Sequence, residues 1–88
     1  MLNIEVDDYD TWKQLFDSDP AGRKQAANGH RIFRASDNPN HVLISAEFPS
    51  VDDAKAFRER LIASGALKNA SAIHMQPTVT DLAEAVTY

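Results

Sequence analysis

The sequence HRIFRASDNPNHVLISAEF, which spans residues 30–48, decides the fold. It contains two stretches with the alternating polar and apolar residues of a β-strand, His30–Ala35 and His41–Phe48. Between them, Asp37-Asn38-Pro39-Asn40 is a dense cluster of turn-forming residues. This arrangement predicts an antiparallel β-hairpin, in which residues pair outward from the turn. The expected pairs are Arg34 with Leu43, Ile32 with Ser45, and His30 with Glu47.

A strand and a helix are expected before the hairpin. Leu2–Val6 alternates apolar and polar residues, as a strand with one packed face does. The acidic residues that follow favour a helix N-terminus, and Tyr9, Trp12 and Phe16 then recur at helical spacing. We expect this aromatic stripe to pack in the core rather than to line a ligand site. Asp19-Pro20 predicts a break, after which a second helical piece begins.

A further helix and a last strand are expected after the hairpin. Ser50 is a favourable N-cap with Asp53 as its capping-box partner, and the helix that they start ends at Gly65. Ala72–Gln76 alternates again and predicts the final strand. The C-terminal extension, Thr78–Tyr88, is expected to form either a short helix or a strand that lies on a partner.

The predicted order is therefore β-α-β-β-α-β, within a single domain that spans residues 1–88. This order is typical of the ferredoxin-like α+β fold, a four-stranded antiparallel sheet with two helices on one face. The alternation places a nearly apolar set under the helices: Leu2, Ile4, Val6, Phe33, Val42, Ile44, Ala46, Phe48, Ile73 and Met75. It places a mixed set on the other face: Asn3, Glu5, His30, Ile32, Arg34, Leu43, Ser45, Glu47, Ala72, His74 and Gln76.

The composition excludes several classes of function. The 88 residues include 9 basic and 13 acidic side chains, with a pI near 5.1, which argues against general nucleic-acid binding. Without cysteine there is no thiolate chemistry and no sulfur-ligated metal. No apolar run approaches the ~20 residues of a membrane span, and the N-terminus lacks the pattern of a secretion signal. We therefore expect a cytoplasmic protein without a membrane partner.

Several motifs resemble those of the dimeric α+β barrel superfamily. The stretch Val6-Asp7-Asp8-Tyr9-Asp10-Thr11-Trp12-Lys13 resembles its first half, and Ile32-Phe33-Arg34 and Ala54-Lys55-Ala56-Phe57 continue the likeness. In outline the chain is similar to uncharacterised proteins related to the antibiotic-biosynthesis monooxygenases. This resemblance implies a homodimer in which two sheets face each other, so that the mixed face lines a lumen between them.

The mixed face holds the candidate site residues. His30 with Glu47 is the most attractive pair, because a cross-strand carboxylate can orient an imidazole that acts as a general base. The competing interpretation is an ordinary cross-strand ion pair worth less than about 1 kcal/mol. The residues expected to contact a ligand in the lumen are Asn3, Glu5, Arg34, Ser45 and His74.

Other chemistries find less support in the sequence. No metal site is expected, because the histidines and carboxylates lack compact ligand spacing, and the absence of cofactor-binding motifs predicts no cofactor. Arg34 either binds an anionic ligand or balances the charges of Glu5 and Glu47 inside a closed barrel. His41, beside the turn, is expected in solvent.

The residues and the resemblance leave three hypotheses about function. The leading one is a small homodimer that binds a small polar or aromatic molecule in the barrel lumen, either as a simple binder or as an enzyme. The second is a non-catalytic dimer or interaction module whose inward polar face forms a hydrogen-bonded, water-filled seam. The third, which rests on the resemblance alone, is a cofactor-independent monooxygenase-like enzyme.

Overall fold

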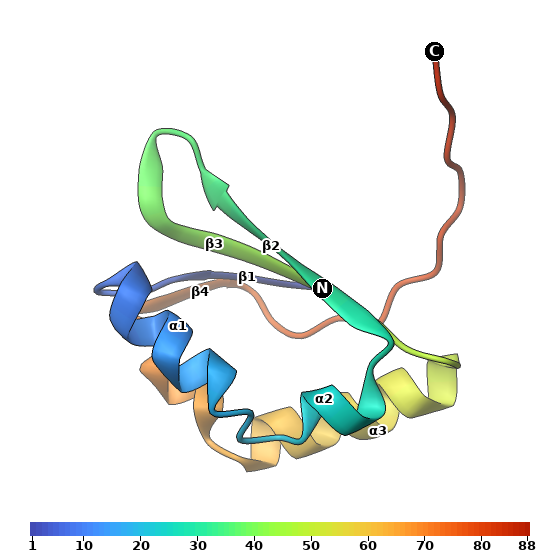
Figure 1. Ribbon diagram of the computed structural model, residues 1–88, viewed down its shortest axis with the longest axis horizontal. Coiled ribbons are helices and arrows are strands. Elements are labelled where there is room, and N and C mark those ends of the chain that lie inside the picture. The colour runs from blue at the N-terminus through green and yellow to red at the C-terminus, as the bar shows by residue number, and fades with distance from the viewer.

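The computed structural model describes residues 1–88, and Figure 1 shows one sheet with the helices on one of its sides. In chain order the elements are β1 (Leu2–Glu5), α1 (Tyr9–Asp17), α2 (Arg23–Ala26), β2 (Gly29–Ala35), β3 (Asn38–Glu47), α3 (Val51–Ala63), the 3₁₀ helix η1 (Ala66–Asn69) and β4 (Ala72–Met75). The strand order is β2-β3-β1-β4, and every pair is antiparallel. The expected α+β class with a four-stranded antiparallel sheet is confirmed. None of the helices is both long and apolar enough to cross a membrane.

Side-chain caps fix where the two longer helices begin. The carboxylate of Asp8 accepts hydrogen bonds from Thr11 N at 2.9 Å and from Thr11 Oγ1 at 2.8 Å. The backbone bond first, and the hydroxyl bond second, hold the pKa of Asp8 below its usual value. Ser50 caps α3 as predicted, because its Oγ accepts from Asp53 N at 3.1 Å and donates to Asp53 Oδ2 at 2.9 Å.

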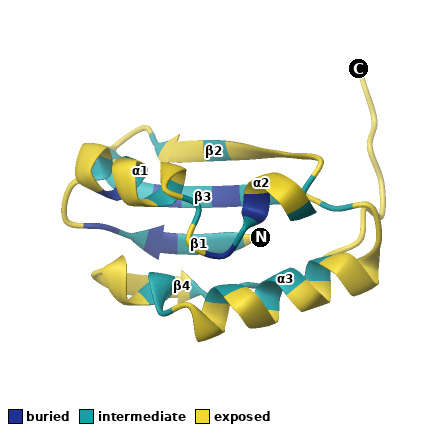
Figure 2. Cartoon of the chain, turned by 60° about the horizontal axis from the view of Figure 1, so that its bottom comes forward, coloured by how far each residue is buried: buried dark blue, intermediate teal, exposed yellow.

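The core lies between the helices and the middle of the sheet, where Figure 2 shows the buried residues. Its buried members are Ile4, Val6, Trp12, Val42 and Ile44. Val42 is completely enclosed. The aromatic stripe of α1 belongs to this core, since the Trp12 ring lies 5.8 Å from that of Tyr9 and 5.1 Å from that of Phe16, centroid to centroid. The interpretation of the stripe as core side chains is confirmed.

The hairpin differs from its predicted register by one residue. His30 lies opposite Ala46 rather than Glu47. The other expected pairs are wrong in the same way: Ile32 lies opposite Ile44, and Arg34 lies opposite Val42. Because successive side chains of a strand point to opposite faces, this difference turns every β2 side chain to the other side of the sheet.

The change of face is visible at Ile32 and Phe33. Ile32, expected on the polar face, packs against the buried core. Phe33, expected in the core, is 53% exposed on the side without helices. A second departure occurs at the edge strand β4, where Ile73 is also expected in the core but is 38% exposed.

A bulge in β3 causes the register of the hairpin. Ala35 pairs with Asn38 across a tight turn, but the preceding β2 residue, Arg34, pairs with Val42. Three β3 residues, 39–41, therefore have no partner on β2. The three extra residues are on β3. Because three is an odd number, the side chains of the neighbouring strand β2 that would face one side of the sheet face the other side instead.

Polar contacts hold the bulge in place. Pro39 has no N–H to give to a strand ladder, and its carbonyl accepts a hydrogen bond from Arg34 Nε at 2.9 Å. Asn40 ties the bulge to the start of α1, because its Oδ1 accepts from Tyr9 N at 3.0 Å and its Nδ2 donates to the carbonyl of Asp7 at 3.3 Å. The side chains of this turn thus set the register of the whole hairpin.

The C-terminal extension runs apart from the sheet. Paired backbone hydrogen bonds of 2.8 and 3.0 Å join Met1 to Thr78, and the chain then leaves the domain. The side chains of Leu82, Val86 and Tyr88 are largely exposed. In Figure 1 this segment rises on the side of the sheet opposite to the helices. No helix forms in it, and a strand that lies on a partner stays a prediction.

Candidate functional site

The side of the sheet that carries no helix, here called the open face, is bare in the single chain (Figure 1). The side chains on it come from all four strands: Asn3, Glu5, Arg31, Phe33, His41, Leu43, Ser45, Glu47 and His74. Phe33 and Leu43 lie opposite each other on neighbouring strands and supply its apolar part. The open face therefore combines apolar and polar groups, as a ligand site does.

Four polar side chains of the open face form one connected group, here called the histidine cluster: Asn3, Glu5, His41 and His74. His74 Nε2 lies 2.8 Å from Glu5 Oε1, and His41 Nε2 lies 2.6 Å from Asn3 Oδ1. The two imidazole rings lie against each other, with their centroids 4.9 Å apart and their planes inclined by 39°.

The local structure explains how these side chains meet. Asn3 and Glu5 are two residues apart on β1 and therefore point to the same face. The antiparallel register of β1 with β3 places His41 opposite Glu5 on one side of β1. Strand β4 lies on the other side of β1 and brings His74 to the carboxylate of Glu5. The central strand thus anchors both rings.

Each imidazole of the histidine cluster keeps one ring nitrogen free. Because the carboxylate of Glu5 and Oδ1 of Asn3 are acceptors, Nε2 of each neutral ring carries the hydrogen and donates it. Nδ1 of each ring is then an acceptor without a partner in the chain. A carboxylate that fixes the tautomer in this way makes His74 a candidate general base.

The histidine cluster is open to solvent in the single chain. The side chains of His74 and Glu5 are 45% and 38% exposed. An ion pair this exposed contributes at most about 1 kcal/mol to the free energy of unfolding. Stability is therefore a weak reason for the pair, and a role in recognition or proton transfer fits its exposure better. No group of three or more His, Cys, Asp or Glu side chains is arranged to hold a metal ion.

His30 lies on the helix side of the sheet and not on the open face. Its ring packs edge-on against Phe16, with 5.2 Å between the centroids. Burial, followed by the nearby charges of Arg23 and Lys13, lowers the pKa of His30. Glu47 remains on the open face, opposite Gly29. The predicted catalytic pair of His30 and Glu47 therefore does not form, because the bulge turns β2 over.

The predicted ligand contacts lie on two different sides of the sheet. Arg34 lies on the helix side, with its guanidinium 3.8 Å from the centroid of the Tyr9 ring, and does not share a face with the histidine cluster. The structure places the remaining predicted contacts on the open face: Asn3, Glu5, Ser45 and His74. Of these, three join the cluster, while Ser45 lies farther along β3 opposite Arg31.

His41 is the residue of the cluster that sequence reasoning missed. The sequence predicts it in solvent beside the turn, whereas the structure places it within β3 and half-buried against His74. The alternation of β3 is the signal that could have found it. His41 is in phase with Leu43 and Ser45, which the sequence already assigns to the polar face, so a strand that begins before His41 puts this ring on the open face.

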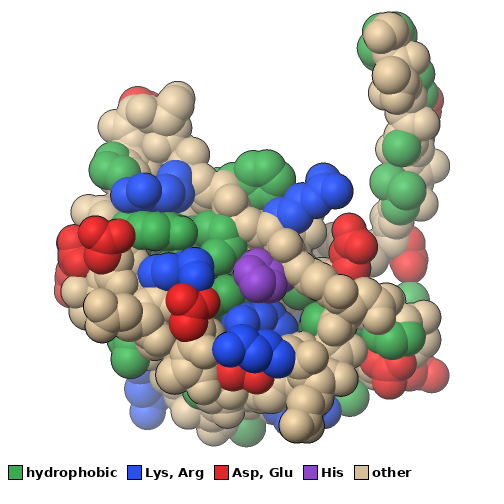
Figure 3. Space-filling model, viewed as in Figure 1, with side chains coloured by type: hydrophobic (Ala, Val, Ile, Leu, Met, Phe, Trp, Pro, Cys, Tyr) green, Lys and Arg blue, Asp and Glu red, His purple; other side chains and the backbone are tan.

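Charges of both signs are interspersed on the surface. The open face carries the carboxylates of Glu5 and Glu47 and the guanidinium of Arg31. Figure 3 shows a similar mixture on the side of the molecule drawn there, where Lys and Arg side chains lie beside Asp and Glu. The polar groups of the open face thus suit a neutral or mixed partner better than a strongly charged one.

Comparisons of the chain with protein-family models, with curated proteins and with solved structures found no match. The resemblance to the dimeric α+β barrels therefore stays a prediction. The open face and its histidine cluster are the observations on which a function can be argued.

Proposed function

We propose that this chain is a ferredoxin-like protein that pairs with a second copy through the open face, and that the resulting barrel lumen binds a small polar or aromatic molecule. The single observation that carries the proposal is the histidine cluster on a sheet face that no helix covers. Polar groups held by one another beside exposed apolar side chains form the kind of surface that recognises a small molecule once water is excluded.

Three features support a second copy of this chain as the partner. Phe33 is 53% exposed at the edge of the open face, next to Leu43, and a facing sheet would bury this apolar side chain. The face carries acidic and basic groups together, so two copies can complement each other. The C-terminal extension rises on the same side, with Leu82 83% exposed, and reaches a copy that sits there.

The cluster supports proton transfer within this lumen. His74 is the base, because its Nε2–H is held by Glu5 and its Nδ1 is free to take a proton. His41, fixed by Asn3, supplies a second acceptor against the first ring. The corresponding reaction removes a proton from a hydroxyl or an activated carbon of the bound molecule. Enclosure by the partner sheet strengthens these electrostatic interactions.

A matched pair of variants tests the proposal. Thermal shifts are measured with a panel of small aromatic and polar compounds on the wild-type chain, on His74→Gln and on His30→Gln. His30 is the control, because it lies on the helix side. We expect at least one compound to stabilise the wild type and the His30 variant but not the His74 variant. Equal responses of the two variants, or no response to any compound, contradict a site at the histidine cluster.

The same measurements separate the other hypotheses. In a non-catalytic dimer, His74→Gln changes dimer stability without any difference in compound response. A monooxygenase-like enzyme consumes oxygen in the presence of an anthrone, and the absence of uptake argues against that activity. A monomer by native mass spectrometry at micromolar concentration contradicts every hypothesis that needs a barrel.

A further inference from the structure

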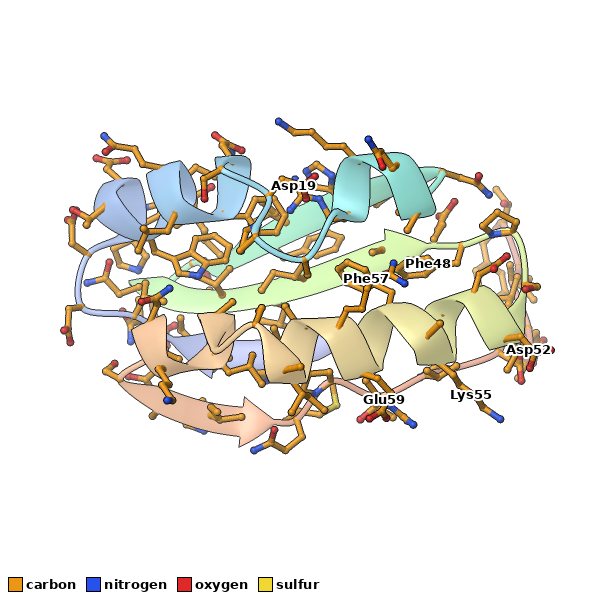
Figure 4. The ribbon with its side chains drawn as sticks, turned by 90° about the horizontal axis from the view of Figure 1, so that it is seen from below. Asp19, Phe48, Asp52, Lys55, Phe57 and Glu59 are labelled. Atoms are coloured by element: carbon orange, nitrogen blue, oxygen red, sulfur yellow. The ribbon has the colours of Figure 1, made fainter.

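A small cavity lies on the helix side of the sheet, away from the open face. It has a volume of about 90 Å³ and lies between the α1–α2 connection and α3 with η1. Most of its lining is apolar, with Ile4 and Ile44 on the floor and Trp12 and Phe57 in the walls. Figure 4 shows Asp19 on the α1–α2 connection and Phe57 on the side of α3 that faces the sheet. Exposed residues such as Leu15 also line it, so the cavity reaches the surface.

Arg23 supplies an unusual buried charge beside this apolar space. The side chain is only 7% exposed. Its Nη1 donates to the carbonyl of Phe16 at 3.2 Å, and the guanidinium lies 3.7 Å from the centroid of the Phe16 ring. The guanidinium makes no other hydrogen bond within the chain, so it retains donors that a further acceptor can use.

Asp19 is the incomplete partner of Arg23. Its Oδ2 accepts a hydrogen bond from Lys24 N at 3.1 Å, but Oδ1 is enclosed and has no hydrogen-bond partner. The distance from Oδ1 to Arg23 Nη1 is 3.9 Å, too long for a direct hydrogen bond. Asp19 is also the one non-glycine residue with a positive φ, of 60°. Buried polar atoms are nearly always paired, so the unpaired Oδ1 calls for an explanation, and a functional role is one.

From these contacts we infer that the cavity binds a small neutral hydrophobic molecule that carries one hydroxyl, of the class of phenol. The hydroxyl bridges the gap of 3.9 Å, because it donates to Asp19 Oδ1 and accepts from Arg23 Nη1. Oδ1 is enclosed, so in this proposal the hydroxyl reaches it only with a rotation of the carboxylate toward the cavity, which also shifts Oδ2 relative to Lys24 N. The apolar part of the ligand lies against Trp12 and the aliphatic lining.

The chemistry of the pair selects this class of ligand over others. The charges of Asp19 and Arg23 already balance, so an anion is repelled by the carboxylate and a cation by the guanidinium. A purely apolar molecule fills the space but leaves Oδ1 unpaired. The volume suits one ring that extends toward the exposed lining, and not a larger polycyclic compound. This site is independent of the proposed lumen on the other side of the sheet.

Trp12 makes the inference directly testable, because it is the single tryptophan of the chain and lines the cavity. Its fluorescence, excited at the red edge where the probes do not absorb, is titrated with phenol and with toluene, which has the same shape without the hydroxyl. We expect phenol to change the emission and to bind at least about tenfold more tightly than toluene, as a hydrogen bond to a charged group provides. Equal affinities, or no change in Trp12 emission, overturn the inference.

Two aspartates provide matched variants. Asp19→Asn removes the charge at a backbone conformation that asparagine adopts readily, and we expect it to abolish most of the preference for phenol. Asp17→Asn is the control, because that carboxylate instead pairs with Lys13 at 2.6 Å on the surface of α1. An equal loss in both variants contradicts the inference. Ala66→Leu, which fills the cavity from η1, should abolish binding of both probes without touching the Asp19 pair.

Discussion

The rings of His41 and His74 lie with their centroids 4.9 Å apart, although they belong to strands that do not pair with each other. Strand β1 separates β3 from β4, and its residues Asn3 and Glu5 each hold one of the two rings. The contact therefore depends on three strands at once. Loss of Asn3 or Glu5 removes the hydrogen bond that holds one ring against the other.

Glu5→Gln tests whether the histidine cluster serves binding or stability. The variant loses the carboxylate that holds His74, so the compound response of the wild type should disappear. The free energy of unfolding should change by less than about 1 kcal/mol, because the pair is exposed. Urea denaturation and thermal shift measure the two effects. Glu59→Gln on the outer side of α3, visible in Figure 4, should leave both unchanged.

Phe33→Lys tests the open face as the dimer interface. A charge at this exposed apolar position should weaken a dimer that covers it by at least about tenfold, because burial of an unpaired charge is unfavourable. Native mass spectrometry over a concentration series measures the effect. The control is Ile62→Lys, which places the same charge at a 50% exposed residue of α3. If only the control variant weakens the dimer, the dimer interface is not on the open face.

His30 predicts a pH dependence of stability with a defined sign. Burial and the positive charges of Arg23 and Lys13 lower the pKa of His30 below the usual 6.5, so the unfolded chain takes up the proton first as the pH falls. The contribution is therefore fully present above about pH 6.5 and decreases as the pH falls from there toward the folded pKa. Urea midpoints of the wild type and of His30→Gln measure it. Identical pH profiles of the two proteins contradict this origin.

Val42→Ala tests the centre of the core. The side chain is fully enclosed, and loss of its methyl groups should lower the free energy of unfolding by about 2 kcal/mol, from lost burial and an unfilled cavity. Val86→Ala, in the exposed C-terminal extension, should change it by less than about 0.5 kcal/mol. Equal effects in chemical denaturation would show that Val42 is not the centre of the packed core.

The sequence allows much of the fold to be predicted because several of its patterns have only one good solution. Strands β1 and β3 alternate cleanly, and their buried residues Ile4, Val42 and Ile44 lie on the expected side. The cap at Ser50 and the aromatic stripe that contains Trp12 also form as predicted. In each case the residue types on the two faces are so different that the reverse arrangement would bury polar groups.

Strand β2 could not be predicted in this way, because its apolar residues Ile32 and Phe33 are adjacent in the sequence. Either residue can face the core, so the alternation of β2 alone does not decide its face. The decision comes from the bulge at residues 39–41, whose contacts reach to α1 and are invisible in a local pattern. The same uncertainty is the reason that the sequence predicts the wrong side of the sheet for His30 and Arg34.

The three-residue bulge has a consequence for any relative or variant whose hairpin differs in length. Its effect depends on parity: adding or removing one residue there exchanges the two sides of β2, whereas a change of two residues preserves them. A single-codon insertion or deletion near Pro39 would thus carry His30 toward the bare side and Phe33 toward the helices without altering any other residue. When a relative or variant is compared with this chain, whether its hairpin differs by an odd or an even number of residues says more about which β2 side chains face the site than the similarity of the hairpin residues does.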